Sequence, residues 1–170
     1  NEAHSILQRM NELATQSAND TNTTADRTAV QSEVNALTNE LSRIASTSQF
    51  NTQNLLDGTF TGKNLQVGAL ENQKITISIG TMNAKALGVD SLDVKSFSKA
   101  GSAMTLIQKA ISKVSGQRSD LGALQNRLEH TVNNLDNISE NTQTAESRIR
   151  DTDMASEMVQ YSATSIIQQA

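Results

Sequence analysis

Two histidines are the side chains of this sequence best suited to bind a transition metal or to transfer protons near neutral pH. His4 and His130 stand far apart, each within a segment of helical pattern. Zinc sites combine His and Cys at short, fixed spacings, but neither histidine has such a neighbour and the chain contains no cysteine. We therefore interpret both as exposed helix residues, and the sequence predicts no metal site.

Asp151 and Asp153 form a second candidate, because two carboxylates at this spacing could share a calcium ion. An EF-hand loop needs further oxygen ligands at fixed positions and a glutamate at its end, and the residues after Asp153 do not supply them. The run from Asp151 to Asp153 is more typical of a polar break between two helices.

Other residue types that can act in catalysis are present, but not in the sequence motifs that form known active sites. Ser, Asp and His all occur, but there is no GxSxG nucleophile turn and no HExxH zinc motif. Neither GxxxxGK[ST] nor GxGxxG appears, so no loop is suited to cradle phosphates. The sequence thus predicts a protein that is not an enzyme and binds no cofactor.

Composition favours a thin, helical architecture. The 170 residues are 36% apolar but only 2% aromatic, which suits an aliphatic seam between helices better than a thick core. The absence of proline permits long unbroken helices. The net charge of −4, without a basic run, disfavours nucleic-acid binding, and no apolar run approaches the roughly 20 residues of a membrane span.

Apolar spacing predicts two helices in the first part of the chain. The first covers about residues 2–18, and the second covers about 24–46. Thr23 and Asp26 form a variant of the capping box that begins the second helix. The core-facing residues of the two are Ile6, Leu7, Met10, Leu13, Ala14 and Ser17, followed by Val30, Val34, Leu37, Leu41 and Ile44.

Residues 49–96 change to a strand and loop pattern. Ile75, Ile77 and Ile79 alternate with polar residues, which predicts a half-buried strand over 74–79. Residues 65–67 can pair with it in a β-hairpin through 68–73. We expect Phe50, Leu55, Leu56 and Phe60 to anchor the start of this region, and Leu87, Val89, Leu92 and Val94 to pack down from an irregular segment over 80–96.

The longest predicted helix covers about residues 102–150. One heptad series is apolar, with Ile107, Val114, Leu121, Leu128 and Leu135, continued by Thr142 and Ile149. A second series, with Met104, Ile111 and Arg118, is mixed. We therefore expect a mainly α fold: an elongated, rod-like antiparallel helical bundle with two shorter helices, one long C-terminal helix and a β-hairpin region. A further helix begins at Met154, and because both chain ends fall within helical pattern, we expect a trimmed fragment.

Three separate segments resemble bacterial flagellin, in the order found in that family. They are LQRMNELATQSAND at residues 7–20, QNRLEHTVNNL at 125–135 and AESRIRDTDM at 145–154. The resemblance implies a structural subunit of the flagellar filament, secreted to the cell exterior. It further implies that 1–153 are the D1 domain and that 154–170 begin a truncated C-terminal D0 helix. The outer D2 and D3 domains are absent, because residues 96–102 join the hairpin region directly to the last helix.

The resemblance also implies partners. These are other flagellin subunits through D1 and D0 contacts, the innate immune Toll-like receptor 5, and the flagellin export chaperone and regulator. The receptor contacts carried over by position are Leu7, Gln8, Arg9, Leu13, Gln16 and Glu33. From residue types alone, Arg9 and Leu13 also fit a solvated arginine beside a core leucine. The alternatives are a hook–filament junction protein of the same family, or an enzyme or small-molecule binder.

Overall fold

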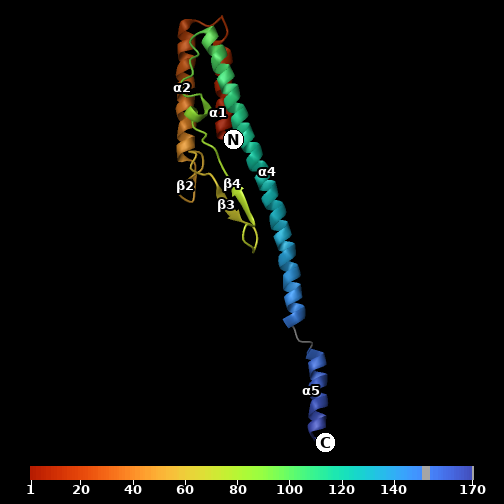
Figure 1. Ribbon diagram of the computed structural model, residues 1–170. Coiled ribbons are helices and arrows are strands. Elements are labelled where there is room, and N and C mark those ends of the chain that lie inside the picture. The colour runs from red at the N-terminus through yellow and green to blue at the C-terminus, as the bar shows by residue number, and fades with distance from the viewer. Residues whose placement is uncertain (151–153, 170) are drawn as a thin grey trace. The chain divides into compact units, whose positions relative to one another are not determined.

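The computed structural model describes residues 1–150 and 154–169, with side chains over 1–150 and 156–168. Along the chain the elements are α1 (Glu2–Ser17), α2 (Thr24–Thr47), β1 (Gln49–Phe50), β2 (Gln53–Asn54), β3 (Lys63–Gln66), β4 (Lys74–Ile77), α3 (Ala84–Leu87), α4 (Phe97–Arg150) and α5 (Met154–Gln169) (Figure 1). Residues 1–126 and 127–170 form two compact units. The mainly helical fold with small antiparallel hairpins is thus confirmed, while the predicted break at 151–153 lies outside the described residues.

Helices α1 and α2 begin and end where the local sequence predicts. Thr23 is the N-cap of α2: its Oγ1 accepts a hydrogen bond from the Asp26 N–H, and the Asp26 carboxylate accepts from the Thr23 N–H at 2.9 Å. The Thr23 hydroxyl also donates to the Asp26 carboxylate at 2.7 Å. This bond, followed by the bond from the Thr23 N–H, holds the pKa of the Asp26 carboxyl below its ordinary value. α1 runs antiparallel to α2 and to the first part of α4 (Figure 1).

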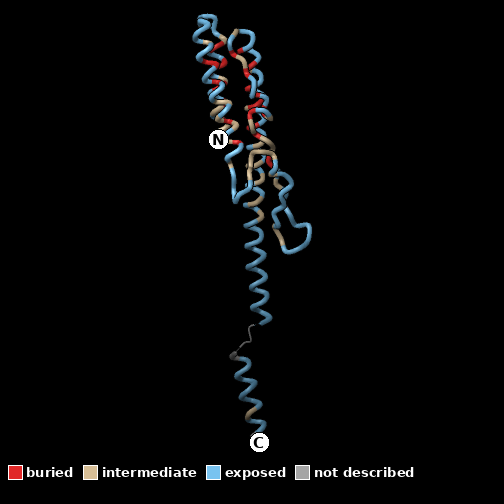
Figure 2. Tube along the Cα trace, turned by 90° about the vertical axis from the view of Figure 1, so that its left-hand side faces the viewer, coloured by how far each residue is buried: buried red, intermediate tan, exposed pale blue. Residues whose placement is uncertain are grey.

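The core of the first unit is one apolar cluster that joins α1, α2, the segment after β4 and α4 (Figure 2). α1 and α2 contribute their predicted faces, and the irregular segment packs down as expected, with Val89 and Val94 fully buried. A short helix that the sequence did not predict, α3, lies in this segment. Asn83 caps it, because its side chain accepts from the Ala86 N–H, and Gly88 ends it with a φ of 75°.

α4 begins at Phe97, five residues before the predicted start. Ser96 acts as its cap: the Ser96 carbonyl accepts from the Ala100 N–H at 2.8 Å, and its Oγ accepts from the Lys99 N–H. The predicted first heptad series is buried at Ile107 and Val114. The second series also faces inward, because Met104 and Ile111 are partly buried against the core cluster. The buried residues beside them are alanines, namely Ala100, Ala103 and Ala110.

The predicted seam also ends earlier than expected. Leu121 and Leu128 are only half-buried, Leu135 is 37% exposed, and Ile149 is 88% exposed. Burial of the series thus decreases after Val114, and the expectation that the whole heptad series forms a packed seam is wrong at Leu135 and Ile149.

Two hairpins follow α2. The predicted one is confirmed as β3 and β4, antiparallel with Leu65 opposite Ile75. Ile75 and Ile79 are buried while Thr76 and Ser78 are exposed, as the alternation predicts. A smaller hairpin, β1–β2, was not predicted; its turn residues Asn51 and Thr52 both have positive φ. This turn carries Phe50 outward, so its predicted anchoring role is wrong: its side chain is 74% exposed.

Candidate partner-binding site on helices α1 and α2

An arginine and a glutamate from different helices meet on the surface of the first unit. The buried face of α1 holds Leu7, Met10 and Leu13, and Arg9 lies exposed at the edge of this face. Glu33 stands next to the buried Val34 on α2, toward α1. The Arg9 Nε and Nη2 both donate to Glu33 Oε1, at 3.0 and 2.8 Å.

Glu12 completes this charged site from one turn further along α1. Its Oε2 accepts from Arg9 Nη1 at 3.2 Å. The bonds to Glu33 and then to Glu12 raise the pKa of the Arg9 guanidinium above its ordinary value. About half of the Arg9 side chain is exposed, so solvent screens the pair and it stabilises the fold little. The two glutamates hold the guanidinium in one orientation.

The six residues implied by the resemblance divide by burial. Gln8, Arg9, Gln16 and Glu33 are exposed, whereas Leu7 and Leu13 are 0% and 1% exposed. An open groove between α1 and α2 is lined by Leu13 and by residues on both sides of it, namely Gln16, Asn22, Asp26, Ala29, Val30 and Glu33. Leu7 and Leu13 are thus buried in the unbound chain, although Leu13 also lines the groove, and all six residues remain predicted contacts.

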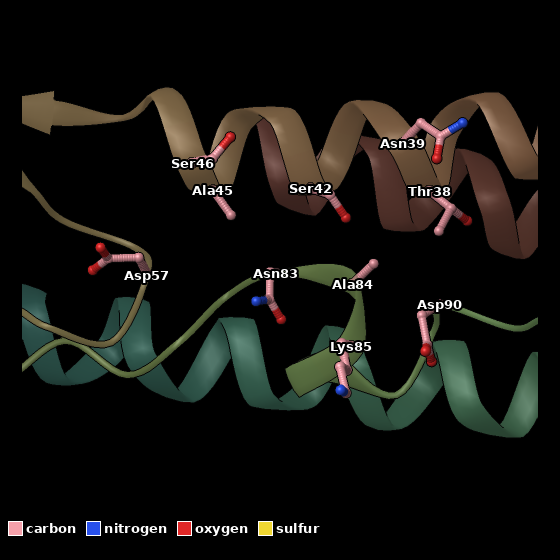
Figure 3. Close-up of a pocket in the computed structure, with 10 residues that line it drawn as sticks. All are labelled: Thr38, Asn39, Ser42, Ala45, Ser46, Asp57, Asn83, Ala84, Lys85 and Asp90. Atoms are coloured by element: carbon pink, nitrogen blue, oxygen red, sulfur yellow. The ribbon is translucent and has the colours of Figure 1, made fainter.

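A second groove lies between α2 and the segment around α3 (Figure 3). Its lining is polar and includes Ser42, Asp57, Asn83, Lys85 and Asp90. Two of these side chains already have local partners. The Asn83 amide oxygen caps α3, and Asp57 accepts from the Thr59 hydroxyl, which lowers the pKa of its carboxyl.

The histidines differ from each other. His130 is exposed as predicted, but His4 is half-buried, with its Nδ1 buried and without a hydrogen-bond partner, so the expectation that both are exposed is wrong for His4. Over residues 1–150 and 154–169, no group of three His, Cys, Asp or Glu side chains is placed to hold a metal ion. None of the described helices has the length and apolar content to cross a membrane.

The second unit presents apolar side chains to solvent. On α4 these are Val132 at 55%, Ile138 at 53% and Ile149 at 88% exposure. On α5, Val159, Tyr161 and Ile167 exceed 70%. Apolar positions at helical spacing without a covering element mark a surface for contact with another helix.

Sequence reasoning missed two parts of these sites. Glu12 could have been found, because it lies three residues from Arg9 on one helix. The pairing of Arg9 with Glu33 could not, because the two residues stand 24 positions apart on different helices.

Known proteins resemble both ends of this chain. Residues 1–61 match the bacterial flagellin N-terminal helical region, and residues 104–170 match the bacterial flagellin C-terminal helical region. The chain is 48% identical to a flagellin of Halalkalibacterium halodurans over 99% of its own length and 63% of the relative's. It is 45% identical to the flagellar filament core protein flaB2 of Brachyspira hyodysenteriae, over 99% and 65%. The chain thus spans somewhat less than two thirds of these relatives.

A solved structure extends the likeness to the fold. The crystal structure of Bacillus cereus flagellin matches with a TM-score of 0.65 and 32% identity, over 78% of this chain and 77% of that one.

Proposed function

This chain belongs to the flagellin family, and we propose that it is the helical core of a structural subunit of the bacterial flagellar filament, not an enzyme. The observation that carries the proposal is the match of both terminal helical regions to this family. The exposed apolar positions of the second unit support it, because a filament subunit needs surfaces that other helices cover.

The domain assignment and the partners follow from the same proposal. Residues 1–153 are the D1 domain, and residues 154–170 begin the C-terminal D0 helix. The subunit is secreted and acts outside the cell, in the filament. Its partners are other flagellin subunits, together with the export chaperone and the export regulator.

Electron microscopy of the full-length protein tests the filament role. We expect long filaments from the full-length protein. Ile149→Asp should impair assembly, because it places a charge at an apolar position that is 88% exposed here. Asn141→Asp adds the same charge at a polar, exposed position of the same helix and should assemble normally. Failure of the full-length protein to form filaments would favour the alternative, a hook–filament junction protein.

The fragment itself should behave differently. Because family assembly depends on D0, residues 1–170 alone should remain monomeric in light scattering at high concentration. Long ordered filaments from this fragment would contradict that expectation.

A second function is recognition of the monomer by Toll-like receptor 5. The specific observation in its favour is the exposed Arg9, which Glu33 and Glu12 hold in one orientation. An oriented guanidinium loses less conformational entropy on binding than a free one. Arg9 is then the leading contact, Glu33 a second charged contact, and Gln8 and Gln16 are polar neighbours.

Binding to the purified receptor ectodomain tests this assignment. Arg9→Ala should raise the Kd by about thirtyfold or more, which corresponds to about 2 kcal/mol. Since Arg9 and Glu33 pair with each other, the Arg9→Ala and Glu33→Ala double variant should lose less than the sum of the two single losses.

Arg43→Ala is the matched control, because Arg43 also pairs with a glutamate on the helical surface, at 2.6 Å from Glu40, but lies outside the site. Its affinity should stay within about twofold of wild type. Circular dichroism checks folding. Wild-type affinity for folded Arg9→Ala and folded Glu33→Ala would show that the receptor site is misassigned.

A further inference from the structure

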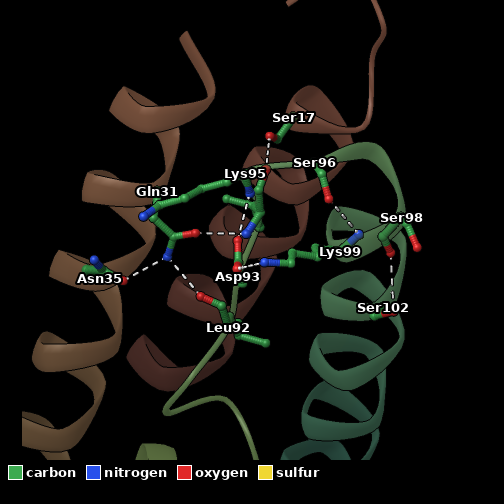
Figure 4. A network of polar contacts seen from close by, with 11 residues as sticks. Ser17, Gln31, Asn35, Leu92, Asp93, Lys95, Ser96, Ser98, Lys99 and Ser102 are labelled. Carbon is green, nitrogen blue, oxygen red and sulfur yellow. Dashed lines mark hydrogen bonds and ion pairs between the residues drawn. The ribbon is translucent and has the colours of Figure 1, made fainter. Parts of the chain in front are cut away.

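Two glutamines bind extended backbone in the same way. The Gln31 amide on α2 donates to the Leu92 carbonyl and accepts from the Val94 N–H, both at 2.8 Å (Figure 4). The Gln117 amide on α4 donates to the Ser78 carbonyl at 3.3 Å and accepts from the Gly80 N–H at 3.2 Å. In each case one side-chain amide takes the place of a neighbouring strand, pairing with residues i and i+2.

The two clamps differ in their surroundings. Gln31 is buried at 7% exposure, and its amide also donates to Asn35. The Ser17 hydroxyl donates to the Val94 carbonyl as well, so several side chains hold this part of the backbone. Gln117 is only half-buried and its bonds are longer. Water can therefore compete for the Gln117 bonds more readily than for those of Gln31.

The place of Gln117 on α4 is unusual for a polar residue. It stands seven residues after Ala110 and fourteen after Ala103, on the inward line of the helix. An apolar residue there would extend the core. A polar side chain on this line is expected only where it finds partners, and the backbone of Ser78 and Gly80 supplies them.

Gln117 is also the polar link between the helices and the hairpin segment, which we define as residues 57–82. Over residues 1–150 and 154–169, no other hydrogen bond or ion pair connects this segment with α1, α2, α4 or α5. Its other hydrogen bonds lie within residues 48–82; for example, the Met82 N–H donates to the Leu56 carbonyl. Met82 belongs to the buried core cluster, and Ile75 and Ile79 are also buried, at 6% and 8% exposure, but outside that cluster.

We propose that Gln117 is a latch: it fixes the hairpin segment to α4, and this segment opens from the helices as one local unit when the latch is released. The physical basis is its small number of attachments. With three buried apolar side chains and a single amide clamp, the segment has fewer attachments than the helices beside it, and therefore a lower opening free energy. Release leaves the packing of α1, α2 and α4 in place, since that core is built from other residues. Gln117 is a positioning residue, and the device is a hinged hairpin.

Amide hydrogen exchange in the full 170-residue chain tests the latch. Gln117→Met keeps the length of the side chain and removes both bonds. At constant pH and temperature, amides of the hairpin segment, including Gly80 and Ile79, should exchange at least fivefold faster than in wild type. Amides in α1 and α2 should stay within twofold.

Gln31→Met is the matched control, because it removes the same pair of bonds from the buried clamp. Gln31→Met should accelerate amide exchange in α1 and α2, and not only in the hairpin segment, since loss of the buried Gln31 bonds weakens the core. Acceleration of the hairpin segment below fivefold in Gln117→Met would overturn the proposal. So would an equal acceleration in α1 and α2, because that would show a general loss of stability and not a local opening.

Discussion

Ile107→Ala should be among the most damaging single truncations in this chain. Ile107 is 0% exposed and lies midway along the inward line of α4, between Ala103 and Ala110. Those alanines cannot extend to fill the space. The substitution removes three carbon atoms and leaves a cavity, which costs about 2–5 kcal/mol in a packed core.

Ile138→Ala provides a control with the same chemistry on the same helix. Ile138 is 53% exposed, so the truncation leaves no cavity, and alanine has the better helix propensity. We expect a change within about 0.5 kcal/mol. The contrast between the two variants depends on burial alone.

Thermal unfolding followed by circular dichroism measures the difference. For a unit of this size, a loss of about 3 kcal/mol should lower the Tm by about 10 °C, while Ile138→Ala should leave it nearly unchanged. Leu128→Ala, at a half-buried position, should fall between the two. If Ile138→Ala lowered the Tm as much as Ile107→Ala, the assignment of the buried face of α4 would be refuted.

Three further expectations concern polar groups. Gln31→Met should lower the free energy of unfolding by about 2 kcal/mol, because it leaves the buried Leu92 carbonyl and Val94 N–H without partners; urea unfolding measures this, and an unchanged midpoint would contradict it. Thr23→Ala should cost about 1 kcal/mol through loss of the α2 cap, whereas Thr23→Ser should retain most of it in the same assay. The carboxyls of Asp26, Asp57 and Asp93 accept hydrogen bonds that lower their pKa values in the folded state. For Asp93 the first of these donors is the Lys99 ammonium. Their stabilising contribution is therefore present above the ordinary carboxylate pKa and lost as the pH falls through the folded values; stability that stayed flat on acidification would count against these bonds.

Local patterns in the sequence were sufficient to predict α1, α2 and β4. In each element, the spacing of the apolar residues identifies the buried face. Thr23 and Asp26 mark the start of α2, because their hydrogen bonds join residues only three positions apart. The same reasoning missed α3 and the β1–β2 turn. These are short, and their start and end depend on single side chains such as Asn83 or on backbone at positive φ, which carry little signal in a sequence.

The buried face of α4 required the tertiary structure. A heptad pattern gives the spacing of inward positions, but it did not show that Ala103 and Ala110 are buried more completely than Met104 and Ile111. Where burial stops, after Val114, depends on which elements lie beside the helix, and no local pattern records that.

The candidate site divides in the same way. The residue types and the family resemblance determined which positions to consider. The sequence also allowed the other interpretation, in which Arg9 is solvated and Leu13 belongs to the core. Only the fold decided that Leu13 lies beneath the surface and that Arg9 is held by Glu33. The same is true of Gln31 and Gln117, whose backbone partners lie 61 and 37 residues away in the chain. A side chain's partner on another element is set by how the elements pack, and that packing is a property of the whole core and not of any local stretch of residues.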